Sequence, residues 1–264
     1  MLVAAGSSSS NFCAAAAIGA AVAGLRCELL FSGPEPARTG PNVELARAAG
    51  ATLIFDAAST REELDDAVIV HADVLRGRGH QPYAVPRGGA TAIGALGYAE
   101  AAAELAMQCQ AASIDVGTVV VATGSGGTQS GLVAGRVGFG LSWRVVGASV
   151  SRPVDEIADR ILVTAQACAA ELDLKPPGTA DVDVRDCRGA GFGIPSVEDR
   201  ASARLALTCE GLLLDDYYTA KAMTLLRELA ALEPSEPFVF WHTGGLVAAF
   251  GALDRGALGS GGTT

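Results

Sequence analysis

Residues 118–131 join an apolar run to a glycine-rich turn and then to a helical pattern. The apolar run reads TVVVAT, and glycines follow it at positions 124, 126 and 127. Glycine lets successive backbone N–H groups converge on one anion at the N-terminus of a helix, which here is expected to begin at Thr128. The segment therefore predicts a phosphate-binding loop. Its binding residues are predicted to be Gly124, Ser125, Gly126, Gly127 and Thr128.

Two nucleotide-binding interpretations of this loop are disfavoured. The loop lacks the Lys-[Ser/Thr] ending of a nucleoside-triphosphate loop. The spacing of its glycines also differs from the G-x-G-x-x-G pattern of dinucleotide-binding turns. Simple tight packing of a strand against a helix stays open as an alternative, because glycine-rich turns of this kind are common.

Short apolar strands alternate with helical patterns along the chain, which predicts an α/β protein with parallel sheet. Strands are expected over residues 1–5, 28–31, 52–56, 83–86, 118–122, 144–149 and 238–241. Helices are expected over residues 11–24, 42–49, 61–77, 91–109, 128–138, 153–172, 197–211 and 219–232. No long polar linker divides the chain, and a domain boundary is placed near residue 100. This gives a small domain over residues 1–100 and a large one over residues 101–264.

The composition is that of a globular protein able to bury a large core, with 264 residues of which 50% are hydrophobic. Acidic side chains outnumber basic ones by 29 to 19, and no basic stripe is visible, so nucleic acid and anionic membranes are poor partners. The six cysteines and three histidines are scattered, which favours reduced thiols, a cytoplasmic location and no metal site. The abundance of Ala, Gly and Arg suggests a bacterial source.

Seven further segments that could contribute to the same site lie before and after the loop. They are GSSSSN (6–11), PRGG (86–89), GALGY (94–98), GAGFGIP (189–195), EGLLLD (210–215), YTAKAM (218–223) and HTGG (242–245). Together with ATGSGGTQSG (122–131), they resemble the family of pyridoxal-phosphate enzymes that contains D-cysteine desulfhydrase and 1-aminocyclopropane-1-carboxylate deaminase. The resemblance covers nearly the whole chain.

The resemblance implies a three-layer, parallel-sheet fold like that of the tryptophan synthase β subunit, with two domains and pyridoxal 5′-phosphate in the cleft between them. It also implies a homodimer. The turn that contains Ser9, Ser10 and Asn11 would bind the substrate carboxylate, although Ser10 and Asn11 are equally typical of a helix N-cap. Thr243 matches the position whose side chain meets the pyridine nitrogen of the cofactor.

Tyr218 is the best candidate for an acid/base residue or for polarising the substrate, with half-buried packing as the alternative. Ser10 is the second candidate catalytic residue. Phe192 stands where the family has a tyrosine, so a ring is kept near the cofactor but a phenol is lost. Ser9 replaces a glutamine and Phe12 a histidine or glutamine, and we therefore expect altered substrate contacts.

The lysine that forms a Schiff base with the cofactor in this family lies before the serine turn, in a segment that this sequence does not include. The chain has two lysines, Lys175 and Lys221, and neither is expected to replace it, because a nucleophilic amine must be desolvated and aimed at the cofactor. The sequence is thus expected to be truncated at its N-terminus, to have an incomplete large domain and to be inactive by itself.

The implied function is that of a lyase or deaminase that acts on a small amino acid and releases ammonia and a keto acid, with sulfide if the substrate is D-cysteine. Two alternatives stay open. The protein could be a catalytically dead relative that binds pyridoxal phosphate or another phosphorylated ligand without covalent chemistry. Alternatively, a second polypeptide could supply the lysine segment.

Overall fold

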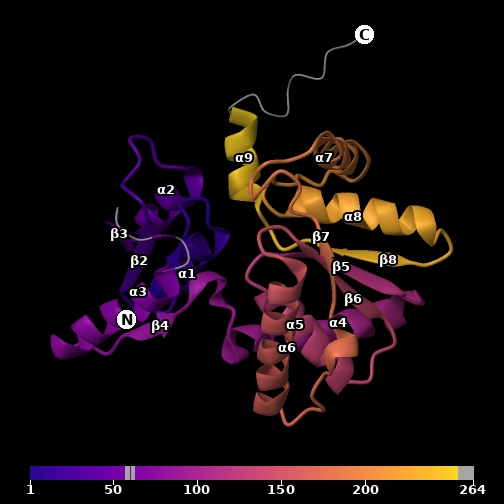
Figure 1. Ribbon diagram of the computed structural model, residues 1–264, viewed down its shortest axis with the longest axis horizontal. Helices are drawn as coiled ribbons and strands as arrows, with labels where there is room; N and C mark the ends of the chain where they lie inside the picture. The colour runs from indigo at the N-terminus through magenta and orange to yellow at the C-terminus, as the bar shows by residue number, and fades with distance from the viewer. Residues whose placement is uncertain (57–59, 61–62, 255–264) are drawn as a thin grey trace. The chain divides into compact units, whose positions relative to one another are not determined.

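The computed structural model describes residues 1–56, 60 and 63–254. The chain divides into two compact units, Met1–Gly89 and Ala90–Thr264, each with its own parallel sheet (Figure 1). The division lies earlier than the boundary expected near residue 100, which falls inside helix α4 (Ala92–Ala112). The roles assigned to the two domains stay a prediction.

The first unit contains a four-stranded sheet in the order β3-β2-β1-β4, with all neighbouring strands parallel. Its strands are β1 (Leu2–Gly6), β2 (Cys27–Ser32), β3 (Thr52–Asp56) and β4 (Tyr83–Val85). Its helices are α1 (Asn11–Val22), α2 (Pro41–Ala48), α3 (Leu64–Gly77) and the short 3₁₀ turn η1 (Arg87–Gly89).

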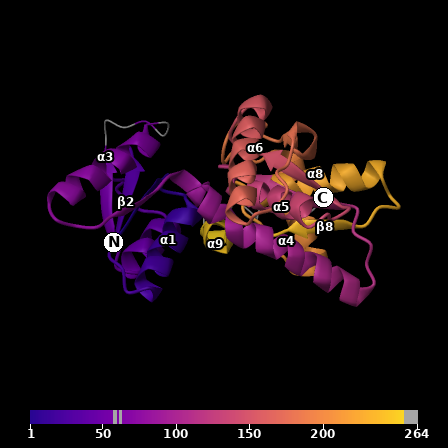
Figure 2. The ribbon, with the colours of Figure 1, turned by 90° about the horizontal axis from the view of Figure 1, so that it is seen from below.

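Alternation of side chains along β1 gives this unit two cores. Ala4 points to the face covered by α1 and α2, whereas Val3 and Ala5 point to the face covered by α3. Figure 2 shows α1 and α3 on opposite sides of this sheet. Both faces of the strands are therefore buried, which explains their continuous apolar sequences.

The second unit contains the sheet β7-β6-β5-β8, which is also fully parallel. Its strands are β5 (Thr118–Thr123), β6 (Arg144–Ser149), β7 (Asp183–Asp186) and β8 (Phe238–Trp241). Its helices are α4, α5 (Gly127–Gly138), α6 (Val154–Glu171), α7 (Val197–Glu210), α8 (Thr219–Leu232), α9 (Leu246–Asp254) and the 3₁₀ turn η2 (Thr179–Asp181).

The central strand β5 is buried over its whole length because helices cover both faces of the sheet. Val119 and Val121 pack against α4, α5 and α6, while Val120 and Ala122 pack against α8. Figure 1 shows α8 on one face of this sheet and α5 and α6 on the other. Helix α7 packs in turn on α8. The predicted three-layer α/β class with parallel sheet is confirmed.

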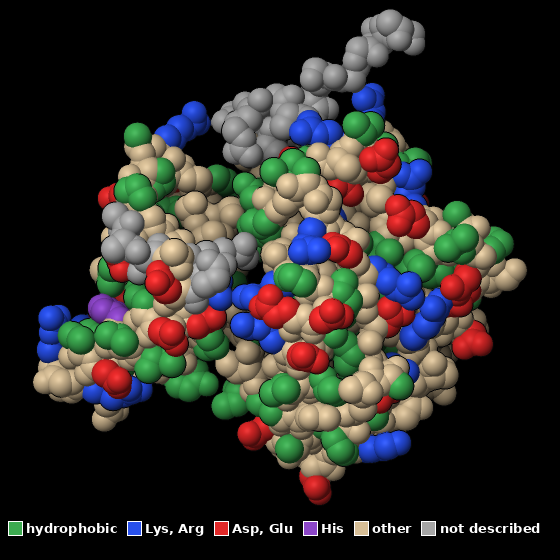
Figure 3. Space-filling view, viewed as in Figure 1, with side chains coloured by type: hydrophobic (Ala, Val, Ile, Leu, Met, Phe, Trp, Pro, Cys, Tyr) green, Lys and Arg blue, Asp and Glu red, His purple; other side chains and the backbone are tan. Residues whose placement is uncertain are grey.

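All seven expected strands are present, whereas β7 and α9 were not predicted. Strand β7 reads DVRD and buries Val184 alone among its four residues, so it lacks the apolar run that marks an internal strand. The residues expected to begin α3, 61 and 62, lie outside the described residues. Within the described part of the chain, every helix is too short or too polar to cross a membrane. On the face of the second unit seen in Figure 3, acidic and basic side chains are interspersed.

Candidate active site

The glycine-rich loop connects the carboxyl end of β5 to the N-terminus of α5. Gly126 is the N-cap residue of α5 and has a φ of 96°, which a residue with a Cβ atom rarely adopts. No described side chain caps this helix, which begins at Gly127, one residue earlier than expected. The first-turn N–H groups and the positive end of the helix dipole are thus directed to the loop, an arrangement that fits a phosphate group.

Two side chains hold the loop in this conformation. Ser130 Oγ donates a hydrogen bond of 2.9 Å to the carbonyl oxygen of Gly126. Ser151, which follows β6, donates from its Oγ to the carbonyl oxygen of Gly124 over 3.3 Å. The loop carbonyls are therefore bound by protein hydroxyls, which fixes the orientation of the intervening peptide groups.

The ring of Tyr218 packs against this loop. A Cβ atom on Gly124 would lie 2.9 Å from Cε1 of Tyr218, so Gly124 is needed for the close approach. The Phe192 ring meets the Tyr218 ring edge to face, with 5.5 Å between their centroids, and lies 5.4 Å from that of Tyr217. Two residues expected at the site from the sequence, Tyr218 and Phe192, are thus in contact with each other.

The buried carboxylate of Asp215 sets the backbone around Tyr218. Its Oδ1 accepts hydrogen bonds of 2.8 Å from the backbone N–H groups of Tyr217 and Tyr218, and its Oδ2 accepts one from Thr219 Oγ1 at 2.8 Å. A Cβ atom on Gly245 would overlap Oδ2, so the turn after β8 also packs on this carboxylate. Asp215 therefore links the start of α8 to the turn that contains Thr243.

Thr243 is exposed and follows β8, the parallel neighbour of β5. Because the carboxyl ends of parallel strands share one edge of the sheet, Thr243 and the glycine-rich loop emerge at the same edge. Ser151 after β6 and Arg188 after β7 emerge there too. This is the edge at which ligands bind in open α/β sheets.

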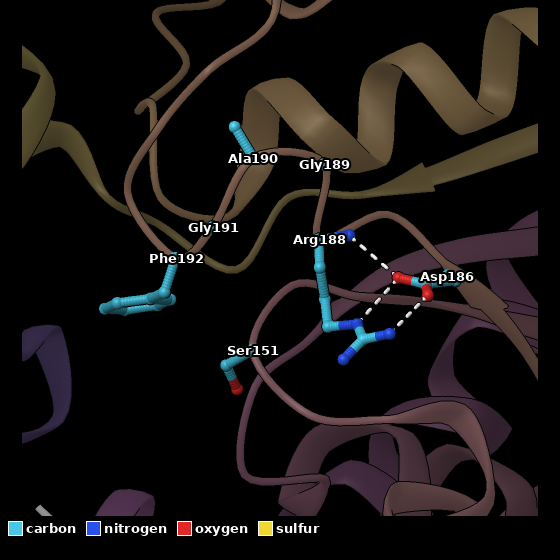
Figure 4. A pocket seen from close by; sticks show the side chains of 7 residues that line it. All are labelled: Ser151, Asp186, Arg188, Gly189, Ala190, Gly191 and Phe192. Carbon is cyan, nitrogen blue, oxygen red and sulfur yellow. Dashed lines mark hydrogen bonds and ion pairs between the residues drawn. The ribbon is translucent and has the colours of Figure 1, made fainter.

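A cavity of about 670 Å³ lies at this edge (Figure 4). Its lining consists of Ser151, Asp186, Arg188, Gly189, Ala190, Gly191 and Phe192. Arg188 binds both carboxylate oxygens of Asp186, with Nε to Oδ1 at 2.9 Å and Nη2 to Oδ2 at 2.7 Å. This guanidinium lowers the pKa of Asp186 to about 2.

The serine turn of the first unit combines a helix cap with a network of amide contacts. Ser10 is the N-cap residue of α1, and its Oγ accepts a hydrogen bond of 3.2 Å from the N–H of Cys13. Asn42, which is 4% exposed, donates from Nδ2 to the carbonyl oxygen of Ser9 at 3.0 Å and to Asn11 Oδ1 at 2.9 Å. The turn is therefore held rigidly in front of a helix N-terminus, which suits an anionic ligand.

Phe12 shows why the residue after Ser10 and Asn11 can be aromatic here. A Cβ atom on Gly89 would lie 2.8 Å from Cε2 of Phe12, so the ring packs on the Gly88–Gly89 turn. Arg87 fixes that turn through its backbone N–H and its Nη2, which both bind the carboxylate of Asp65 at 2.9 Å. Phe12 is thus a packing residue of the first unit.

The two lysines lie in different surroundings. Lys175 is exposed, and Lys221 is buried in α8, where its amine donates to protein oxygens. Among the described residues, no group of three His, Cys, Asp or Glu side chains is placed to hold a metal ion. All six cysteines are free thiols.

Several site residues were not anticipated from the sequence. Asp186 is the last residue of β7, and Ser151 and Arg188 follow β6 and β7. The ends of these strands meet at the cavity, a signal that topology alone supplies. Asn42 and Asp215 act through buried hydrogen bonds to backbone and side-chain groups, and single polar residues in a sequence give no sign of such partners.

Comparison with known proteins agrees with this description. The sequence profile of the family described as pyridoxal-phosphate dependent enzyme matches residues 2–244. A D-cysteine desulfhydrase from Klebsiella pneumoniae (strain 342) is 36% identical over 260 residues, which cover 94% of this chain and 77% of the relative.

Solved structures give the same result. The crystal structure of an ACC deaminase homologue superposes with a TM-score of 0.87 at 30% identity, covering 96% of this chain and 76% of the other. Serine racemase from maize superposes with a TM-score of 0.61 at 17% identity, covering 92% of this chain and 73% of the other, and this likeness shows the fold alone. The family expected from the sequence segments is confirmed, and with it the cofactor, pyridoxal phosphate. The chain belongs to the family of pyridoxal-phosphate dependent enzymes.

Proposed function

We propose that this protein binds pyridoxal phosphate through the loop of Gly124, Ser125, Gly126, Gly127 and Thr128 and acts on a small amino acid, releasing ammonia and a keto acid. With D-cysteine as substrate the products include sulfide. The observation that most directly supports cofactor binding is the N-terminus of α5. No described side chain caps this helix, and its N-cap residue, Gly126, has a φ of 96°, so the first-turn N–H groups face the loop. The similarity to a D-cysteine desulfhydrase supports the class of substrate.

The residues of the second unit would divide the work of holding the cofactor. Backbone N–H groups of the loop and the hydroxyls of Ser125 and Thr128 would bind its phosphate. Thr243 would meet the pyridine nitrogen, and its hydroxyl does not enforce protonation there as a carboxylate would. When bound, pyridoxal phosphate supplies an electron sink for bonds broken at the α-carbon of the amino acid.

The remaining roles concern the amino acid. The N–H groups at the start of α1 and the side chains of Ser9, Ser10 and Asn11 would bind its carboxylate. Tyr218 would hold or move a proton, because its phenol is the acid/base group beside the loop that the sequence singles out. The contacts of Asp215 with the backbone at Tyr217 and Tyr218 would keep that phenol in place.

Release of products tests the proposal. With pyridoxal phosphate and D-cysteine, we expect sulfide and keto acid in equal amounts from this chain when the lysine-bearing segment of its family is supplied, and no turnover from this chain alone. Ammonia release from 1-aminocyclopropane-1-carboxylate is measured under the same conditions. Borohydride reduction followed by peptide mapping then reveals whether a lysine holds the cofactor. Absence of turnover with every small amino acid tried, when that segment is supplied, would contradict the proposal.

A second candidate is a relative that binds pyridoxal phosphate, or another phosphorylated ligand, without catalysis. It is favoured by the three departures at Ser9, Phe12 and Phe192 and by the buried contacts of Lys221. This candidate predicts a reversible complex that phosphate displaces and no modified lysine after reduction. Peptide mapping therefore separates the two candidates.

We also propose that the protein works as a homodimer in the cytoplasm. Light scattering of the purified protein would give twice the mass of 26.6 kDa if it is a dimer. A monomeric mass at micromolar concentration would contradict the homodimer.

A further inference from the structure

The cavity of the second unit depends on a segment with little conformational preference of its own. Residues 188–194 supply five of the seven lining residues, and three of the seven residues in this segment are glycines. Glycine-rich backbone loses much entropy when it is held in one conformation. Two hydrogen bonds inside the segment, from Gly191 N–H to Arg188 O and from Ile194 N–H to Gly191 O, fix its conformation in part. The remaining contacts that fix it must come from outside the segment.

Lys221 supplies the missing contacts. Its Nζ donates to the carbonyl oxygen of Arg188 at 3.2 Å and to that of Ile194 at 3.0 Å. These carbonyls stand at the first and last residues of the segment. One ammonium group thus joins the two ends of the loop to helix α8.

The surroundings of Lys221 explain how a charge is tolerated there. Its side chain is 1% exposed, and the third acceptor is the Oδ2 of Asp199 at 3.4 Å, in a side chain that is 7% exposed. Asp199 also receives hydrogen bonds from Ser196 N–H and Thr224 Oγ1, each at 2.9 Å. A buried ammonium with three acceptors and a paired carboxylate is stable, whereas removal of one partner is costly.

We propose that Lys221 is a positioning residue of the cofactor site, and this inference rests on the proposed function. By joining Arg188 and Ile194, it holds the loop between them so that the Phe192 ring lies against Tyr218. Tyr218 in turn lies against Gly124 of the phosphate-binding loop. The lysine acts through the backbone of the loop and does not touch the substrate.

The alternative is a buried ion pair that does no more than join α7 to α8. The two roles differ in where mobility increases when the amine is removed. A positioning role requires faster hydrogen exchange at the amides of residues 189–193, together with weaker cofactor binding. A purely structural role spreads the effect over α7 and α8 and leaves the loop amides as they are.

The test compares wild-type protein with Lys221→Met, and Lys175→Met serves as the matched control because Lys175 is exposed. Hydrogen exchange is measured without cofactor, and binding of pyridoxal phosphate by fluorescence titration. Loss of the charge-assisted hydrogen bonds is expected to speed loop exchange at least about tenfold and to weaken cofactor binding by about tenfold. Lys175→Met is expected to match the wild type in both.

Unchanged loop exchange in Lys221→Met, or faster exchange with unchanged cofactor affinity, would overturn the inference. If Lys221→Met does not fold, Lys221→Gln is measured in its place, because the glutamine amide can still donate to one of the two carbonyls. Its loop amides are expected to exchange faster than those of the wild type and more slowly than those of an unstructured peptide. Wild-type protein that binds no pyridoxal phosphate would reject the proposed function and, with it, a role of Lys221 in cofactor binding. Faster loop exchange in Lys221→Met, which is measured without the cofactor, would then still show that Lys221 holds the loop.

Discussion

The ring of Tyr218 lies so close to the Cα of Gly124 that a side chain at position 124 would come within 2.9 Å of ring carbon Cε1. The residue proposed to move a proton and the loop proposed to bind phosphate therefore form one packed structure. Asp215 fixes the backbone of Tyr218 by accepting a hydrogen bond from its N–H. A substitution of either residue should therefore alter both the position of the Tyr218 ring and the conformation of the loop.

Gly124→Ala tests this contact. The added methyl group must displace the Tyr218 ring or the loop, and overpacking of this kind costs about 1 to 3 kcal/mol. We expect the affinity for pyridoxal phosphate to fall by about tenfold, since 1.4 kcal/mol corresponds to that factor. Gly19→Ala is the control, because a Cβ atom there meets nothing within 4 Å. Equal affinity in the two variants would show that the contact does not matter for binding.

Tyr218→Phe separates the phenol from the ring. The ring keeps its packing against Phe192 and Gly124, so cofactor affinity should match that of the wild type. Loss of a general acid or base should lower kcat for product release by about 10² to 10⁴. Tyr83→Phe, at an exposed tyrosine of β4, should leave kcat unchanged. A Tyr218→Phe protein with wild-type kcat would remove Tyr218 from the chemistry.

Ser10 has two possible roles that substitutions can separate. Ser10→Ala removes the N-cap of α1 and should reduce the free energy of unfolding by about 1 kcal/mol, whereas Ser10→Gly should cost a few tenths. If the hydroxyl also binds the substrate carboxylate, both variants should raise KM by a similar factor. A KM that rises in Ser10→Ala alone, in proportion to lost stability, would indicate a helix cap and nothing more.

The ion pair of Asp186 and Arg188 predicts a pH dependence of stability. Because Arg188 lowers the pKa of Asp186 from 3.8 to about 2, the pair stabilises the fold above pH 3.8, and this contribution is lost as the pH falls through 2. Asp186→Asn should therefore lose less stability than the wild type between pH 4 and pH 2, measured by urea unfolding. Parallel stability curves for the two proteins would contradict the assignment.

The fold could be predicted because its central strands are buried on both faces and read as apolar runs. The ends of the central strand β6 were predicted without error for this reason. The ends of β3 and β8 were also predicted without error, because these edge strands still read as apolar runs, LIF and FVFW. Strand β7 was not predicted because an edge strand needs few apolar residues. Its pairing with β6 is a tertiary contact that its own sequence does not reveal. The position of α4 in the second unit likewise follows from its packing against α5 and the sheet, which its sequence does not encode locally.

The site was predictable where backbone conformation restricts the residue type. Gly126 and its neighbours predict an anion site, because few other residues allow that turn, and the bound anion stays a prediction. Phe192 and Tyr218 were proposed as site residues through the family resemblance, and the structure added their contact with each other. Asn42, Asp199 and Asp215 could not be predicted, because each acts through buried polar partners that are distant in sequence or lie in its own turn.

The most direct test of the account compares the binding of pyridoxal phosphate with that of pyridoxal, which lacks the phosphate. If the N-terminus of α5 anchors the cofactor, several charge-assisted hydrogen bonds are lost with the phosphate, and pyridoxal should bind at least about 100-fold more weakly. Inorganic phosphate should also compete with pyridoxal phosphate. Equal affinities for the two compounds, with no competition by phosphate, would contradict the central claim that a bound phosphate anchors the cofactor in this protein.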